Sequence, residues 1–316
     1  MANEPLPPRV RRALEAARRR YRSFPNVVGI AAGFKFRGGR RAGAPAVQFF
    51  VERKVSRPPR ALPGFVLSRD ARGRAIRSSR IPTDVIAVRS PRFTCGSGAS
   101  LRAFGERGSL ALLFRDRSGG ADRPSRATYL LTCAHVAGDL ERSPPLSPAL
   151  RLGERPEVFA RVLKNCLAAR GVVEYDVALA EVVEGALPVR DLEIRGGGRV
   201  AGWLDPGEIL LGSDLELSAA SGRRRGPLES IAGEFLVYLD GRPYRVQNLW
   251  GLRVEVRDGD SGGLVHRRGR AAGMVVARSS GGFAWWQPLR PALLHLNGCR
   301  PRTRVQPFPM DEGRRP

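Results

Sequence analysis

Residues 257–265 read RDGDSGGLV, and this stretch sets Ser261 between glycine-rich neighbours. A serine hydroxyl is a poor nucleophile until a base takes its proton, and an attacking serine also needs backbone N–H groups around the developing oxyanion. Glycine permits the tight backbone that such a turn requires. Gly259 and Ser261 are the candidates to supply these N–H groups, and Gly262 and Gly263 leave room for a substrate chain. A stretch of this kind can also be a simple turn, so its meaning depends on what accompanies it.

Two further motifs precede this stretch in the chain. Residues 130–136 read LLTCAHV, an apolar strand-like run that leads directly into His135. Residues 174–179 read EYDVAL and set Asp176 in a second strand-like apolar run. A histidine base, an aspartate that orients it and a serine nucleophile are the three side chains that acyl transfer needs. The three motifs together therefore predict nucleophilic catalysis by Ser261.

In the order His135, Asp176 and Ser261, these motifs resemble the trypsin-like serine peptidases of the chymotrypsin fold, over about residues 95–298. The resemblance implies two six-stranded β-barrels with the active site in the cleft between them. It assigns His135 and Asp176 to the first barrel, Ser261 to the second, and the oxyanion hole to the Gly259 and Ser261 backbones. It also implies a serine endopeptidase that cleaves a protein or peptide substrate through an acyl-enzyme intermediate, with no metal and no cofactor.

The sequence from residue 92 onward is mainly β in texture. Many short apolar runs separated by turn residues are typical of barrels or sandwiches rather than of alternating strands and helices. We expect a peptidase domain over residues 92–300, with a short helix at 291–296, and a polar tail over residues 301–316. The expected strands lie at residues 109–114, 128–132, 170–183, 199–204, 208–217, 234–239 and 244–256.

Residues 1–91 are expected to form a small α+β module in front of this domain. A hairpin is expected from residues 27–36 and 46–55, followed by a short strand at 81–88. The segment resembles one that precedes such domains in some bacterial proteins. Because it carries no chemistry of its own, it is a candidate to gate the cleft or to recruit a substrate.

A helix is expected over residues 8–22, at the start of this module. Val10, Leu14, Ala17 and Tyr21 recur at helical spacing and form one apolar stripe, while arginines cover most of the rest. We favour a helix packed on the body of the protein over a basic arm that docks on an acidic partner.

The chain carries 54 lysines and arginines against 30 acids, which gives a formal net charge of +24. Such a field attracts anions and supports an alternative: a catalytically inactive or gated peptidase-fold protein that binds nucleic acid or an acidic partner. The arginines are spread along the chain rather than gathered in one block, which favours solvated positions over a nucleic-acid site. The intact set of three catalytic residue types favours the peptidase.

Four cysteines occur, and none lies at the spacing of a structural zinc site. The N-terminal residues lack the apolar segment of a secretory signal, and no run is long enough for a transmembrane helix. We therefore expect a cytoplasmic protein with reduced thiols. Cys133, two residues before His135 on the expected strand, is interpreted as a buried thiol rather than as a nucleophile.

The chain has only three histidines, so the proposed base has few rivals. His266 is followed by Arg267 and Arg268, which suggests a solvated turn. His295 falls in the expected terminal helix and is interpreted as a packing residue.

The resemblance makes Asp260 a structural ion-pair residue behind the oxyanion turn, and Asp258 a loop charge. The hydrophobic mature N-terminus that partners this aspartate in zymogen-activated members is not apparent, so an arginine is the candidate partner.

Alignment with the family places Glu255 near the base of the substrate pocket and Arg278 on the strand that forms one wall. Glu255 would favour a basic substrate side chain, whereas Arg278 would favour an acidic or small one. The two charges conflict, so the sequence predicts no cleavage preference.

Overall fold

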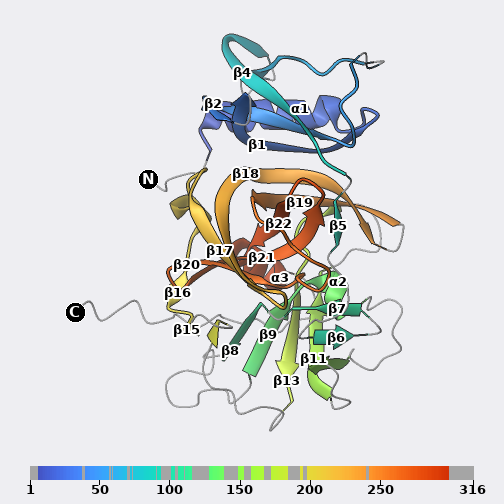
Figure 1. The fold of residues 1–316 in the computed structure, drawn as a ribbon, viewed down its shortest axis with the longest axis vertical. Coiled ribbons are helices and arrows are strands. Elements are labelled where there is room, and N and C mark those ends of the chain that lie inside the picture. Colours follow the sequence, from blue (N-terminus) through green and yellow to red (C-terminus); the bar gives the residue numbers. More distant parts are fainter. Residues whose placement is uncertain are drawn as a thin grey trace, which may run out of the picture.

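The computed structural model describes residues 6–37, 40–56, 58, 60–69, 72, 74–89, 91–93, 101–103, 106–109, 111–115, 128–138, 149–152, 158–166, 172–183, 193–194, 198–239 and 242–298. The predicted tail at 301–316, together with Cys95 and Cys299, lies outside these residues. Three parts follow one another along the longest axis of the molecule: the N-terminal module, a β-barrel and a second β-sheet (Figure 1).

The N-terminal module consists of one helix and four strands. These are α1 (Pro8–Tyr21), β1 (Val27–Arg37), β2 (Arg40–Val51), β3 (Phe65–Arg69) and β4 (Ala75–Ala87). A proline occupies the first turn of α1, where its missing N–H costs nothing, and the helix packs against β1, β2 and β3. Its buried side chains are the predicted stripe plus one alanine, which confirms the packed helix: Val10, Ala13, Leu14, Ala17 and Tyr21.

The predicted hairpin is confirmed as the antiparallel pair β1–β2, but the sequence missed β3. β3 pairs with the first half of β4, so the strand expected at 81–88 begins at Ala75. Residues 57–80 are rich in arginine and proline, which obscures the apolar pattern of a strand. Of the β3 side chains whose burial is described, only Val66 and Ser68 are buried.

The module is attached to the barrel by strand pairing. β1 pairs antiparallel with β18 (Gly222–Leu239), Gly29 lying opposite Phe235. A Cβ at Gly29 would lie 2.0 Å from the Phe235 ring, so glycine is what allows the two strands this close contact. The boundary between residues 91 and 92 remains a prediction, because the sheet runs on from the module into the barrel.

The barrel is a closed ring of antiparallel strands, in the order β17-β18-β19-β22-β21-β20 and back to β17. Its strands besides β18 are β17 (Asp214–Ala219), β19 (Arg242–Leu252), β20 (Leu264–Arg267), β21 (Arg270–Ser279) and β22 (Phe283–Pro288). Short strands join its edges: β5 (Arg92–Phe93), β12 (Val172–Val173) and β16 (Gly202–Trp203). β18 closes the ring because it is long enough to pair with β17 along its first half and with β19 along its second. The sequence predicted only the last part of β18, from residue 234.

The second sheet has seven antiparallel strands in the order β7-β6-β10-β11-β13-β9-β8. They are β6 (Leu101–Ala103), β7 (Glu106–Gly108), β8 (Leu112–Arg115), β9 (Thr128–Thr132), β10 (Ala149–Leu152), β11 (Val158–Asn165) and β13 (Ala178–Val182). The remaining elements are α2 (Ala134–Ala137), the ribbon β14 (Glu193–Ile194) with β15 (Gly198–Arg199), the 3₁₀ turn η1 (Pro206–Glu208) and α3 (Leu289–Gly298). This sheet covers a core of its own that includes Leu130, Leu150 and Phe159.

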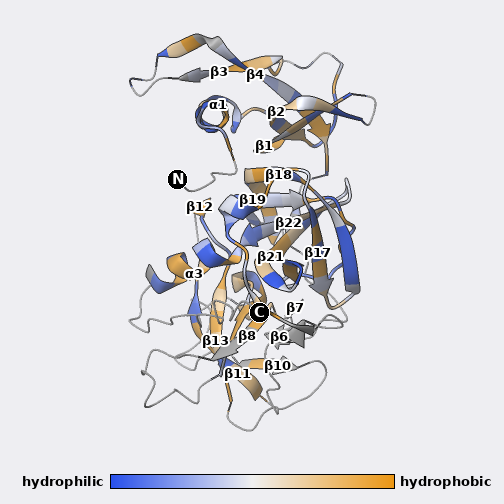
Figure 2. Cartoon of the chain, turned by 90° about the vertical axis from the view of Figure 1, so that its left-hand side faces the viewer, coloured by the Kyte–Doolittle hydropathy of each residue, from blue (hydrophilic) through white to orange (hydrophobic). Residues whose placement is uncertain are grey.

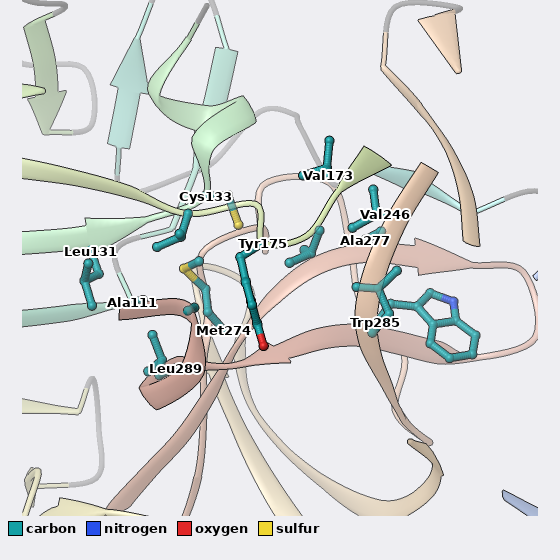
Figure 3. Close-up of a cluster of buried hydrophobic side chains, with 14 of the residues drawn as sticks. Ala111, Leu131, Cys133, Val173, Tyr175, Val246, Met274, Ala277, Trp285 and Leu289 are labelled. Atoms are coloured by element: carbon teal, nitrogen blue, oxygen red, sulfur yellow. The ribbon is translucent and has the colours of Figure 1, made fainter. Parts of the chain in front are cut away.

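Another core lies between the seven-stranded sheet and the barrel (Figure 3). Leu131 of β9 and Cys133, just before α2, share it with Met274, Trp285 and Leu289 from the barrel and α3. Figure 2 shows orange, hydrophobic segments on strands of all three parts. This is expected of sheets that bury one face in a core.

The predicted fold class, mainly β with a small α+β module in front, is confirmed. The barrel that carries the serine motif has the expected six strands, whereas the other sheet has seven. Within the described ranges no helix combines the length and apolarity of a membrane span. The expected cytoplasmic location stays a prediction.

Candidate active site

Strand register brings His135 and Asp176 to one edge of the seven-stranded sheet. Thr132, the last residue of β9, lies opposite Ala178, the first residue of β13. Because the two strands are antiparallel, the segment that follows β9 and the segment that precedes β13 meet at the same end. His135 lies in the short helix α2 just beyond β9, and Asp176 lies two residues before β13.

Two contacts join these residues. His135 N donates to Asp176 Oδ1 at 3.0 Å, and His135 Nδ1 lies 2.5 Å from Asp176 Oδ2. An ionised carboxylate can only accept hydrogen bonds. The contact with Asp176 therefore assigns the ring proton of His135 to Nδ1 and leaves Nε2 as an acceptor.

The sequence placed Asp176 within a strand, but it lies in the connection between β12 and β13. Gln287 of β22 holds this connection, because its Oε1 accepts a hydrogen bond from Asp176 N at 2.8 Å. Gln287 Nε2 donates to Glu174 O at 3.0 Å and to Gln247 O at 2.7 Å. This buried glutamine is a positioning residue that sequence reasoning missed, since no local motif marks it.

Ser261 comes from the barrel, in the turn between β19 and β20. Its Oγ lies 2.9 Å from His135 Nε2 and also 2.9 Å from Val276 O. A hydroxyl has one hydrogen, so Ser261 donates to one of these two acceptors at a time. The structure therefore brings the three predicted side chains into one chain of contacts, from Asp176 through His135 to Ser261.

The turn around Ser261 depends on glycine. Gly259 and Gly262 have φ of +95° and +89°, a region that side chains other than glycine avoid. A Cβ at Gly262 would lie only 1.9 Å from Ser109 O. The Asp260 and Gly263 amides donate within the turn, to Arg257 O and Asp260 O. For the Gly259 N–H, no acceptor is found among the residues that the structure describes.

Asp260 anchors this turn from behind. Its carboxylate is buried and accepts from the Arg257 amide at 2.9 Å, from the Ser221 amide and hydroxyl, and from Arg224 Nη1 at 3.2 Å. The sequence suggested an arginine as the candidate partner of Asp260, and Arg224 takes that place.

Ser109 connects the turn around Ser261 with strand β9 through hydrogen bonds. Its N–H donates to Ser261 O at 2.5 Å, its hydroxyl donates to Gly259 O at 2.8 Å, and its carbonyl accepts from Thr132 Oγ1. Ser109 was predicted only as part of a strand, so its contacts with the turn around Ser261 were also missed.

The three side chains are covered in this structure. Ser261 and Asp176 are 0% exposed, and His135 is 2% exposed. Two cavities of about 500 Å³ lie elsewhere, lined by residues of the N-terminal module that include Lys54 and Asp84. In this structure, therefore, the three side chains are closed off from solvent.

The other candidates fall outside this chain of contacts. His266 is buried in β20 with Ser218 Oγ at 2.9 Å from its Nε2, so the predicted solvated turn is wrong. Leu264, Val265 and His266 of β20 are all buried, so the His266 side chain lies inside despite the arginines that follow it. His295 is half-buried in α3 against the Tyr175 ring, as a packing residue should be. Burial, together with the Glu174 charge, raises the pKa of Tyr175 to about 12, so this phenol stays neutral.

Cys133 is a buried cysteine, as predicted, but it precedes α2 rather than lying within a strand. Its Sγ donates to Val275 O at 3.1 Å. Ligand atoms of Cys133, His135 and Asp176 lie within 4.8 Å of one another, so among the described residues these three form a group that could hold a metal ion. Ion binding there would compete with the His135–Asp176 contact, which already engages one nitrogen and one oxygen.

The predicted pocket residues differ in their surroundings. Glu255 is exposed and takes no part in the hydrogen bonds of the site. Arg278, near the end of β21, forms an ion pair with Asp258, so Asp258 is more than a loose loop charge.

No protein-family model matches the chain, and no curated protein matches it either. Solved structures do show a likeness in fold. A glutamic acid-specific serine protease is 18% identical over 63% of this chain and 95% of its own, with a TM-score of 0.48. Protease A of Thermobifida fusca is 20% identical over 63% and 93%, with a TM-score of 0.46, and the HtrA-type protease AlgW is 14% identical over 92% and 66%, with a TM-score of 0.37. The chain is thus similar to solved proteases, at low identity.

Proposed function

We propose that the protein is a serine endopeptidase in which Ser261 is the nucleophile, His135 the general base and Asp176 the residue that orients the base. The observation that supports this most is the unbroken line of contacts, with Asp176 Oδ2 2.5 Å from His135 Nδ1 and His135 Nε2 2.9 Å from Ser261 Oγ. The distance of 2.9 Å between His135 Nε2 and Ser261 Oγ is within the range expected of a nucleophile and its base.

Acylation follows from this arrangement. Ser261 Oγ attacks the carbonyl carbon of the substrate while His135 Nε2 takes the hydroxyl proton, and Asp176 stabilises the imidazolium that forms. The Gly259 and Ser261 N–H groups stabilise the oxyanion of the tetrahedral intermediate. The C–N bond then breaks, His135 gives its proton to the leaving amine, and an ester to Ser261 remains.

Deacylation repeats the same steps with water. His135 takes a proton from the attacking water, and the ester carbonyl again becomes an oxyanion held by the two amides. Collapse of this intermediate breaks the bond to Ser261 Oγ, which regains its proton from His135. The product is a carboxylic acid and the enzyme returns to its starting state.

Hydrolysis of fluorescently labelled casein tests this proposal. Ser261→Ala should lower the rate about 10⁴-fold or more, because the nucleophile is lost. Ser218→Ala is the matched control, since Ser218 is also a buried serine 2.9 Å from a histidine Nε2, and it should retain the rate. An equal rate in wild type and Ser261→Ala would rule out Ser261 as the nucleophile.

A second candidate is a gated or inactive peptidase-fold protein that binds an anionic partner. The burial of Ser261, His135 and Asp176 favours a closed state, and the net charge of +24 favours an anionic partner. In its nucleic-acid form this candidate requires binding to DNA or RNA that weakens steeply with added salt.

A further inference from the structure

The ion pair between Asp258 and Arg278 joins two segments that both contact the nucleophile. Asp258 immediately precedes Gly259 and lies three residues before Ser261. Arg278 lies two residues beyond Val276, whose carbonyl oxygen is 2.9 Å from Ser261 Oγ. Two strand residues span about 7 Å, so Arg278 is within one side-chain length of the reacting serine.

Arg278 Nη2 lies 2.9 Å from Asp258 Oδ1 and 3.1 Å from Asp258 Oδ2. The two side chains are 42% and 49% exposed, so the pair faces solvent and contributes little to stability. A substrate carboxylate can therefore replace Asp258 at small cost. A guanidinium is planar and always charged, and its paired donors match a carboxylate.

The neighbouring acid has a different task. Asp260 is 0% exposed and is committed to Arg224 and Ser221, so it is not free to exchange. Asp258, two residues earlier, has Arg278 as its ion-pair partner. Glu255 is exposed, whereas Arg278 follows by two residues the carbonyl that contacts Ser261, so the structure favours Arg278 over Glu255 as the charge nearer the reacting serine.

We infer that Arg278 selects substrates with an acidic side chain next to the scissile bond, and that Asp258 occupies Arg278 when no substrate is bound. This inference rests on the proposed peptidase function. A substrate glutamate or aspartate displaces Asp258 and gains the same guanidinium contact, whereas a lysine leaves Arg278 facing a like charge.

A charge exchange tests the inference. The substrates are fluorogenic peptides with a single Glu, Gln or Lys at each position flanking the scissile bond, and kcat/KM is measured for each. The wild type should prefer Glu over Gln at one position by about tenfold or more. Arg278→Gln should remove this preference, and the exchange Asp258→Arg/Arg278→Asp should reverse it in favour of Lys while keeping an ion pair.

Asp258→Asn gives a second, milder readout. It removes the competing carboxylate, so KM for the Glu peptide should fall about threefold or more, because more of the protein then presents a free Arg278. Asp214→Arg/Arg225→Asp is the matched control, an exposed ion pair of 3.1 Å on the β17–β18 hairpin, and it should leave the preference unchanged.

Labelling by a fluorophosphonate, which carries no acidic side chain, separates the two levels of the proposal. A wild type that is labelled but shows no preference for Glu at any position overturns the role of Arg278 alone. The same holds if the exchange variant is labelled and still prefers Glu. A wild type that is not labelled overturns the peptidase and the specificity together.

Discussion

Two buried serine–histidine contacts in this molecule have the same length. Ser261 Oγ lies 2.9 Å from His135 Nε2, and Ser218 Oγ lies 2.9 Å from His266 Nε2. The other ring nitrogen of His135, Nδ1, contacts the carboxylate of Asp176. His266 Nδ1 is buried and has no hydrogen-bond partner among the described residues.

The two serines also differ in their backbones. Ser218 lies inside β17, opposite Leu264 of β20 and Arg223 of β18, so its main chain belongs to a sheet. Ser261 lies in a turn between glycines with positive φ. The distance between serine and histidine is the same in the two contacts, so the proposed catalytic pair differs from the other by the acid bound to its histidine and by the turn around its serine.

The largest expected effect removes the acid. Asp176→Asn should make His135 resemble His266 and lower kcat by about 10⁴-fold, because the amide cannot hold the required tautomer or stabilise the imidazolium. The measurement is peptide hydrolysis with the fold checked by circular dichroism. A folded variant with nearly full activity would contradict the assigned role of Asp176.

The next effect disturbs the turn. Gly262→Ala should destabilise the protein by about 3 kcal/mol or more, because the new Cβ meets Ser109 O in addition to the strain of positive φ. Gly222→Ala is the matched control: φ is +113° there, but nothing lies within 4 Å of the added Cβ. Urea denaturation should show a clearly smaller loss for Gly222→Ala, and equal losses would mean that the contact with Ser109 does not matter.

A smaller effect concerns the support of Asp176. Gln287→Leu should lower kcat/KM by about tenfold, because the Asp176 amide loses its acceptor and the acid shifts. Gln48→Leu removes another fully buried glutamine, far from the site, and controls for simple destabilisation. Similar kcat/KM losses in the two folded variants would assign Gln287 a structural role only.

The smallest effect is the pH dependence of stability. Burial lowers the pKa of His266 below its ordinary value of 6.5, so the unfolded state takes up a proton first as pH falls. The stability that His266 contributes above pH 6.5 is therefore lost at lower pH, with a slope of at most about 1.4 kcal/mol per pH unit for one proton. His266→Gln should flatten the curve of unfolding free energy between pH 7 and 5; an unchanged curve would place the acid sensitivity elsewhere.

The part of the site that could be predicted is local in sequence. The glycines around Ser261, the apolar run before His135 and the run around Asp176 are each short patterns, and strand pairing between β9 and β13 brings two of them together. Gln287, Ser109 and Arg224 act from segments distant in sequence, and their types are common at ordinary strand positions. Only tertiary contacts identify these three residues. The fold class could be predicted because it follows from local patterns, whereas β3 and most of β18 could not, because they are recognised only by their pairing with other strands.

Whether Ser261 is an activated nucleophile is best measured by labelling the purified protein with a fluorophosphonate, with Ser261→Ala, His135→Ala and Ser218→Ala alongside the wild type. We expect a single covalent adduct on Ser261 in wild type and in Ser218→Ala, and none in Ser261→Ala or His135→Ala. A folded wild type without label, or label that persists in Ser261→Ala, would contradict this expectation.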